Sequence, residues 1–162
     1  MPTSHIPSQD FGGKGPNLLF LHANGYPPAC YRPLLTRLAR SNHVTAMLQR
    51  PLWEDSRPED IHDWTPFSDD LLRFLDENES RAPTTVIGHS MGGIAALRAA
   101  LRQPQKFQYL ILLDPVLLPP PSLRSGISHS HSNLRIAFTR IFYLRKIAAA
   151  ILTTLIFSSK DT

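Results

Sequence analysis

The sequence contains the run Val86-Ile87-Gly88-His89-Ser90-Met91-Gly92-Gly93, and this run decides how the fold is interpreted. A β-branched stretch, residues 84–87, precedes the glycines, and a helix-forming stretch, residues 94–101, follows them. The pattern G-x-S-x-G between a strand and a helix is typical of a nucleophile elbow, a sharp turn that exposes one serine. The sequence therefore predicts that Ser90 is a nucleophile.

The residues around this serine have expected roles of their own. Gly88 and Gly92 are expected where the turn leaves no room for a side chain, and Gly93 where the helix must approach its surroundings. The backbone N–H of Met91 would point toward the oxyanion that forms when a serine attacks a carbonyl group. His89 would point away from the substrate, and we interpret it as a packed histidine.

Composition and charge limit the class of protein. The 162 residues suit one domain, and a single cysteine, Cys30, excludes an internal disulfide framework. The spacing of Cys and His indicates no metal site, and no cofactor is expected. Residues 1–121 hold 11 Lys and Arg against 12 Asp and Glu, whereas residues 122–162 hold 6 against 1. A basic excess confined to the tail argues against nucleic-acid binding.

The apolar pattern predicts alternating strands and helices. Short apolar runs bounded by turn residues are typical of strands buried on both faces of a parallel sheet. The predicted order is strand 18–21, helix 31–39, strand 43–48, an irregular connection 51–66, helix 67–75, strand 84–87, helix 91–102 and strand 109–113. This order predicts an α/β fold with a parallel sheet flanked by helices, and ligands at the carboxyl ends of the strands.

The chain divides into four predicted parts. Residues 1–16 are polar and rich in Pro and Gly, so we expect a flexible start, and residues 17–121 would form the core. Residues 122–133 are polar and suit a linker. Residues 134–162 are an apolar, basic tail, which we interpret as the start of a cap that contains an apolar C-terminal helix.

The N-terminus and the tail bear on localisation. No basic segment followed by an apolar one marks a secretory signal at the N-terminus, so the cytoplasm is the expected compartment. Only residues 147–157 of the tail are free of charge, and a membrane span needs roughly 20 residues. Contact of residues 134–157 with a membrane surface stays open as a less favoured alternative.

A second motif supports the first one. The loop His22-Ala23-Asn24-Gly25 follows the first predicted strand, where a second oxyanion donor is needed. Together with Gly88–Gly93 and Leu112-Leu113-Asp114-Pro115, the segment Leu18–Pro28 resembles the serine α/β-hydrolase superfamily. The resemblance covers about residues 10–121. It implies hydrolysis of a small-molecule ester or related acyl substrate through an acyl-serine intermediate.

The resemblance also implies roles within this loop. The N–H of Asn24 would be the second oxyanion donor, and His22 would be a buried scaffold residue beside the nucleophile. Ala23 stands where the family usually has glycine. Four large side chains could line an acyl pocket: Tyr26, Trp53, Trp64 and Met91. For the two tryptophans, however, the favoured interpretation is that they pack a long loop onto the sheet.

The acid and the base of a triad are less clear. Asp114 follows the strand after the elbow, where it is either the triad acid or a cap of a loop or helix. The family's catalytic histidine comes late in the chain. His129 and His131 are the only histidines after the elbow, and either would be a substitute base only if the tail folds back over the sheet.

This pattern leaves alternatives open. The strands that carry the usual acid and histidine have no visible counterpart after Pro121, so we expect a partial fold, truncated after the strand that follows the elbow. One alternative is therefore a catalytically impaired fragment that acts as a binding or association module. The strand Tyr109–Leu113 would then be an apolar sheet edge, through which chains could self-associate.

Overall fold

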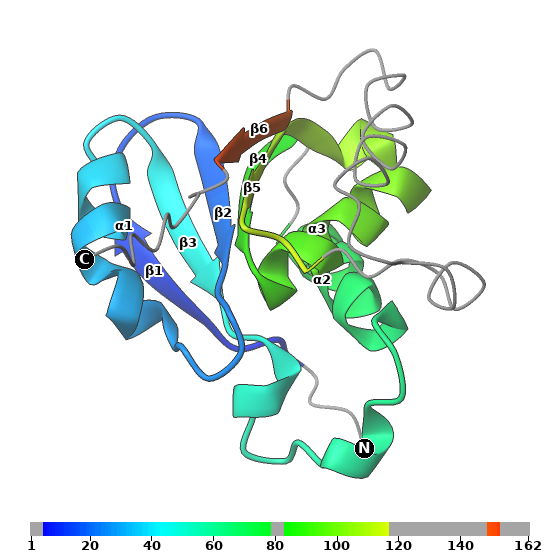
Figure 1. The fold of residues 1–162 in the computed structure, drawn as a ribbon. Coiled ribbons are helices and arrows are strands. Elements are labelled where there is room, and N and C mark those ends of the chain that lie inside the picture. The colour runs from blue at the N-terminus through cyan, green and yellow to red at the C-terminus, as the bar shows by residue number, and fades with distance from the viewer. Residues whose placement is uncertain (1–4, 79–82, 117–148, 153–162) are drawn as a thin grey trace, which may run out of the picture.

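The computed structural model describes residues 5–78, 83–116 and 149–152, and this part of the chain forms a six-stranded sheet with helices on both faces (Figure 1). The strand order is β1-β3-β2-β4-β5-β6. All neighbouring strands are parallel except β1 and β3. The elements are β1 (Ser8–Gly12), β2 (Asn17–Leu21), α1 (Arg32–Leu38), β3 (His43–Met47), α2 (Thr65–Glu77), β4 (Thr84–His89), α3 (Met91–Arg102), β5 (Phe107–Leu113) and β6 (Ala149–Leu152).

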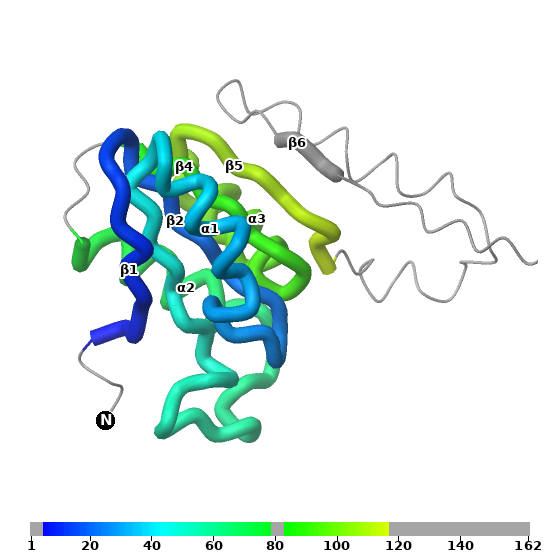
Figure 2. The backbone as a smooth tube through the Cα atoms, turned by 90° about the vertical axis from the view of Figure 1, so that its left-hand side faces the viewer, coloured from blue at the N-terminus to red at the C-terminus, as the bar shows by residue number. Residues whose placement is uncertain are grey.

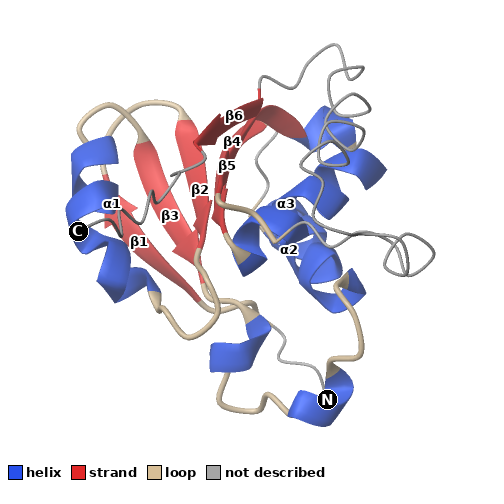
Figure 3. Cartoon of the chain, viewed as in Figure 1, coloured by secondary structure: helices blue, strands red, loops and turns tan. Residues whose placement is uncertain are grey.

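The alternation of side chains along β2 divides the core into two layers. Successive residues of a strand point to opposite faces of the sheet. Leu18 and Phe20 pack with Leu35 of α1 on one face, whereas Leu19 and Leu21 pack with side chains of α2 and α3 on the other. Figure 3 shows α1 on one side of the sheet and α2 with α3 on the other. The continuous apolar run 18–21 therefore belongs to a central strand, as predicted.

The predicted α/β class is confirmed, and the elements agree closely with the pattern that the sequence predicts. The helix after the elbow spans Met91–Arg102, the bounds that we expected. The helix predicted at 67–75 is longer and begins at Thr65, because Asp63 accepts a hydrogen bond from the Thr65 N–H at 2.6 Å and so stabilises the helix start.

The N-terminal stretch differs from the flexible start that we expected for residues 1–16. Residues 8–12 form β1, which pairs antiparallel with β3. Ile6, directly before this strand, is fully buried in the core. The strand is only five residues long, its residues are exposed or half-buried, and it has no apolar run that would reveal it in the sequence. Its anchor is backbone pairing together with one buried isoleucine.

The tail also differs from expectation over its four described residues. Residues 149–152 form β6, which pairs parallel with β5 from Leu110 to Leu113, whereas we expected an apolar helix in this region. Over these residues β5 therefore has a strand on each side, and the expected apolar edge is covered. Self-association stays a prediction. The predicted linker 122–133 lies outside the described residues.

The connection between β3 and α2 positions the candidate site. Figure 2 shows it extending past the end of the sheet at which β3 finishes. It contains two short 3-10 helices, Arg50–Leu52 and Pro58–Asp60. The ion pair of Arg50 with the buried Asp70 of α2, at 2.5 and 2.9 Å, fixes the connection to the helical layer. This connection, which we call the wall, therefore faces the carboxyl ends of β2 and β4.

Candidate active site

The turn between β4 and α3 has a strained backbone at one residue. Ser90 adopts φ 51° and ψ −111°, a conformation that costs free energy for a residue with a side chain. Its N–H donates to Leu113 O at 3.0 Å, and its carbonyl accepts from the N–H groups of Gly93 and Val116 at 3.0 and 3.3 Å. The end of β5 and the first turn of α3 thus hold Ser90 in this conformation.

The three glycines around Ser90 stand where side chains do not fit. A Cβ atom at Gly88 would collide with the carbonyl group of Gly92, and one at Gly92 would collide with the backbone of Leu21. A Cβ atom at Gly93 would lie 2.8 Å from Cβ of Pro115. The elbow therefore packs against the end of β2 and against the loop after β5, which requires glycine at these positions.

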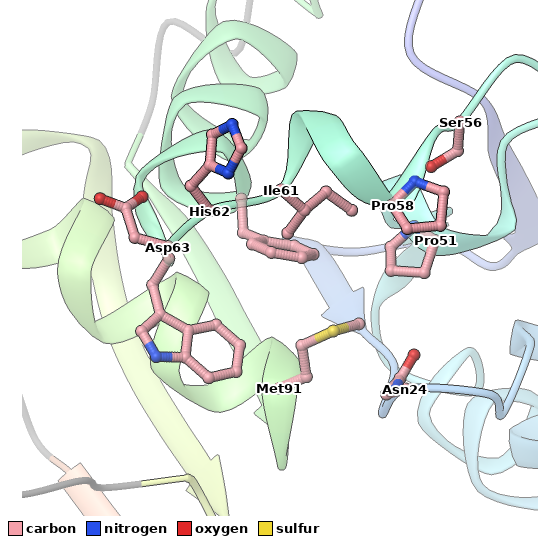
Figure 4. Close-up of a pocket in the computed structure, with 10 residues that line it drawn as sticks. Asn24, Pro51, Ser56, Pro58, Ile61, His62, Asp63 and Met91 are labelled. Carbon is pink, nitrogen blue, oxygen red and sulfur yellow. The ribbon is translucent and has the colours of Figure 1, made fainter.

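Two residues that the sequence predicts as oxyanion donors line one cavity beside the elbow. Met91 begins α3, Asn24 follows β2, and both residues line the same cavity (Figure 4). In the described part of the chain neither N–H has a hydrogen-bond acceptor. N–H groups without an acceptor are the kind of donor that a developing oxyanion requires, and Met91 directly follows Ser90 in the sequence. The sequence pointed to both of these residues.

The loop that carries Asn24 is fixed by a buried histidine. His22 is fully buried, its Nδ1–H donates to Ala23 O at 2.8 Å, and its Nε2 accepts from the Gln49 N–H at 2.9 Å. The Gln49 side-chain amide donates to His22 O. Burial lowers the pKa of His22, so the imidazole is neutral at neutral pH. With both ring nitrogens engaged, this side chain anchors the loop to β3.

A tyrosine that the sequence reasoning missed joins the same loop to the elbow. The Tyr31 hydroxyl accepts from the Ala23 N–H at 3.1 Å and lies 2.7 Å from Nδ1 of His89. His89 is half-buried and packs edge-on against the Tyr31 ring, with ring centroids 5.8 Å apart. The sequence carries no signal for this contact, because 58 residues separate the two rings.

The cavity has a volume of about 550 Å³ and a mostly apolar lining. The β3–α2 connection and the start of α2 supply eight of its ten lining residues, and Asn24 and Met91 supply the rest. In Figure 4 the Met91 side chain points toward Asn24 and Pro51. The residues from the connection and α2 are Pro51, Ser56, Pro58, Ile61, His62, Asp63, Trp64 and Phe67.

Of the four large side chains considered for this pocket, two line the cavity and two do not. Trp64 and Met91 line the cavity. Trp53 is buried in the core and donates from Nε1 to Leu48 O at 2.8 Å, so it packs the loop onto the sheet. Tyr26 is 60% exposed and is not part of the lining. His62 at the cavity was not foreseen, since nothing in its neighbourhood in the sequence marks it.

The triad acid and base stay predictions. Asp114 directly follows β5, is exposed and has a φ of 43°, and the described residues include no hydrogen-bond or ion-pair partner for its carboxylate. In the described part of the chain no side chain hydrogen-bonds to the Ser90 hydroxyl. His129 and His131 lie outside the described residues. Within residues 5–78, 83–116 and 149–152, no group of three or more His, Cys, Asp and Glu could hold a metal ion.

Comparison with known proteins agrees with this geometry. The model of the alpha/beta hydrolase family matches residues 18–158. The chain belongs to the alpha/beta hydrolase family.

Individual relatives share part of their length with the chain. It is 33% identical over 114 residues to the pimeloyl-[acyl-carrier protein] methyl ester esterase of a Shewanella species, covering 69% of this chain and 38% of the relative. It is 31% identical over 119 residues to the type I acyl-CoA thioesterase mpaH of Penicillium brevicompactum, covering 65% and 28%. The chain thus spans about a third of the length of these curated relatives.

A solved structure matches the fold. An alpha/beta hydrolase fold protein from Burkholderia ambifaria superimposes with a TM-score of 0.62 at 22% sequence identity, covering 85% of this chain and 53% of that one. None of the helices in the described residues is long and apolar enough to cross a membrane. The solved structure thus agrees with the family that the sequence match assigns to this chain.

Proposed function

We propose that this chain is a serine hydrolase that cleaves an ester or a related acyl substrate. The strained backbone of Ser90 carries the proposal, because a non-glycine residue held at φ 51° between a strand and a helix presents its hydroxyl at the carboxyl edge of the sheet. Backbone strain of this kind persists only where surrounding contacts enforce it. Here the hydrogen bonds of Ser90 to the end of β5 and to the first turn of α3 do so.

The chemistry would follow in two steps. The Ser90 oxygen attacks the carbonyl carbon while its proton passes to a general base, and the N–H groups of Met91 and Asn24 stabilise the oxyanion. Collapse of the tetrahedral intermediate expels the alcohol or thiol, which takes up the proton and leaves an acyl-serine. Water then attacks the acyl-serine by the same route and releases the acid. Asp114, with His129 or His131, remains our proposal for the acid and base.

The lining of the cavity favours a substrate whose acyl group is uncharged and apolar. Most of its lining side chains are apolar, and no Lys or Arg belongs to the lining. Burial of an acyl chain against such a wall is favourable by roughly 25 cal/mol per Å² of apolar surface. Two relatives carry names of an esterase and a thioesterase, which agrees with an acyl substrate for this chain as well.

A second candidate function is an impaired hydrolase that binds acyl ligands without turnover. The observation in its favour is that no side chain of the described residues hydrogen-bonds to the Ser90 hydroxyl. A serine without a base loses most of its reactivity, and only residual catalysis from the oxyanion donors would remain.

One experiment separates these candidates. The chain is treated with an alkyl fluorophosphonate probe, the labelled residue is identified by mass spectrometry, and hydrolysis of p-nitrophenyl butyrate is measured in parallel. We expect labelling at Ser90 and turnover, both lost in Ser90→Ala and both kept in Ser41→Ala, an exposed turn serine. Labelling without turnover favours the impaired candidate. Turnover that persists in Ser90→Ala overturns the proposal.

A further inference from the structure

The sheet alone does not connect the two loops that form the candidate site. The parallel pairing of β2 with β4 ends at Leu21 and Gly88. Beyond these residues the chain turns away on both sides, toward Asn24 on one and Ser90 on the other. A contact that joins the two loops directly would add to the packing of Gly92 against Leu21 in fixing their separation, and a displacement of about 1 Å in a catalytic group can cost a hundredfold in rate.

The hydroxyl of Tyr31 supplies such a contact. It binds the N–H of Ala23, the residue directly before Asn24, and Nδ1 of His89, the residue directly before Ser90. The Ala23 N–H donates to the hydroxyl, so the hydroxyl proton is free to point to Nδ1 of His89, which then accepts. One oxygen atom therefore joins the backbone of the residue before the predicted oxyanion donor to the side chain of the residue before the predicted nucleophile.

The Tyr31 ring is itself held in place. It lies 4.6 Å from the ring of Phe20, centroid to centroid, and packs against the core layer beneath α1. Burial raises the pKa of Tyr31, so the hydroxyl keeps its proton throughout the neutral range. Phe20 belongs to β2, and the position of the hydroxyl is therefore tied to the rigid sheet rather than to the mobility of a surface loop.

We infer that Tyr31 is a positioning residue that sets the oxyanion loop against the nucleophile elbow. This inference rests on the proposed function for its catalytic consequence. Tyr31 does not touch the reacting atoms, and it acts through Ala23 and His89. Because it aligns groups that act in the transition state, its loss should lower kcat and leave the binding of substrate nearly unchanged.

The test is Tyr31→Phe, which keeps the ring and removes only the hydroxyl. We expect kcat for p-nitrophenyl butyrate to fall by roughly tenfold to a hundredfold, less than the loss of a whole oxyanion donor, with KM changed less than about twofold. The matched control is Tyr109→Phe, an exposed tyrosine on β5, which should leave both constants unchanged. A rise in KM with kcat unchanged would overturn the inference.

A second readout does not depend on turnover. Amide hydrogen exchange at Ala23 is measured by NMR in the wild type and in both variants. Loss of the hydroxyl leaves the buried Ala23 N–H without an acceptor, so its exchange should accelerate at least about tenfold in Tyr31→Phe and remain unchanged in Tyr109→Phe. Unchanged exchange in a folded Tyr31→Phe protein shows that the bridge does not hold the loop.

The two readouts separate the inference from the proposed function. If the wild type shows neither labelling nor hydrolysis, the proposed function fails, and the exchange rate of Ala23 alone decides whether Tyr31 positions the loop. If the wild type is active, the two measurements must agree. A double variant, Tyr31→Phe with His89→Ala, should then lose little more kcat than either single variant, because both remove the same bridge.

Discussion

The elbow after β4 and the loop after β2 form the same candidate site but are held in different ways. Ser90 is fixed by backbone hydrogen bonds to the end of β5 and to the first turn of α3, and the neighbouring glycines allow close approach of β2. The loop at Asn24 is fixed by side chains: those of Tyr31 and Gln49 bind the backbone of Ala23 and His22. The elbow therefore depends on backbone contacts and on glycines, whereas the loop depends on side chains, so the two should respond differently to substitution.

Substitution of Gly92 by alanine should have the largest effect. The new Cβ atom would collide with the backbone of Leu21. Leu21 belongs to β2, which is paired with a strand on each side and therefore cannot shift to make room. We expect a loss of about 4 kcal/mol in the free energy of unfolding, or no folded protein, measured by urea denaturation.

The matched control for this substitution lies in the other region. Gly25→Ala meets no atom within 4 Å, and only its φ of 73° opposes the change, so we expect about 1 kcal/mol. Equal losses in the two variants would show that the close packing of Gly92 against Leu21 does not distinguish the elbow from the loop.

The ion pair of Arg50 with Asp70 joins the wall that faces the elbow to α2. Asp70 is 3% exposed and binds Arg50 through two hydrogen bonds, and Arg50 also lies over the Trp53 ring at 5.1 Å. Asp70→Asn leaves the guanidinium without its counter-charge, and we expect about 3 kcal/mol of destabilisation, reduced from the fully buried case because Arg50 is partly exposed.

The control for this pair is Asp60→Asn. Asp60 pairs with Arg57 in the same connection, but both side chains are about half or more exposed, so the loss should stay below about 0.5 kcal/mol. Both values come from thermal or urea denaturation. If the two variants were destabilised equally, the Asp70 pair would not be what fixes the wall.

Much of the fold could be predicted because its signals are local. The run Leu18–Leu21 is apolar throughout, as a strand covered on both faces must be, and the bounds of α3 follow from a glycine turn and from Pro104. β1 could not be predicted, since its residues are mostly polar and its stability derives from pairing with β3. Pairing between distant segments leaves no periodic pattern in either segment.

The positions of the candidate site residues divide in the same way. Ser90, Met91 and Asn24 belong to motifs that are read within a few residues, and the structure brings them to one edge of the sheet. The contacts of Tyr31 with His89 and of His22 with Gln49 span 58 and 27 residues. They depend on which loops the fold brings together, and a single sequence does not reveal this.

The neutral His22 gives the stability of the loop region a pH dependence. Its pKa is lowered in the folded state, so the unfolded chain binds a proton more readily. The stabilisation is complete above the unfolded pKa of about 6.5 and is lost as the pH falls below that value, by up to about 1.4 kcal/mol per pH unit until the folded pKa is reached.

His22→Gln should remove this part of the slope. His62→Gln, at an exposed histidine, is the matched control and should leave it intact. The measurement is the free energy of unfolding between pH 7 and pH 5 for the wild type and the two variants. A slope that is identical in all three proteins would show that protonation of His22 does not oppose folding.

The smallest expected effect is a change in the preference between charged and uncharged acyl groups. Its measurement tests whether the wall, rather than the elbow, selects the substrate. Asp63 lines the cavity, and the hydrogen bond from the Thr65 N–H lowers its pKa, so it is anionic at neutral pH. Its charge should disfavour an acyl group that ends in a carboxylate, although solvent screens the repulsion.

Asp63→Asn should therefore raise kcat/KM for a p-nitrophenyl hemisuccinate, relative to the butyrate, by about threefold at low salt and by little in 1 M NaCl. Asp55→Asn, at an exposed carboxylate outside the lining, should leave the ratio unchanged. A ratio that changes equally at both salt concentrations would point to altered packing of the wall instead of charge.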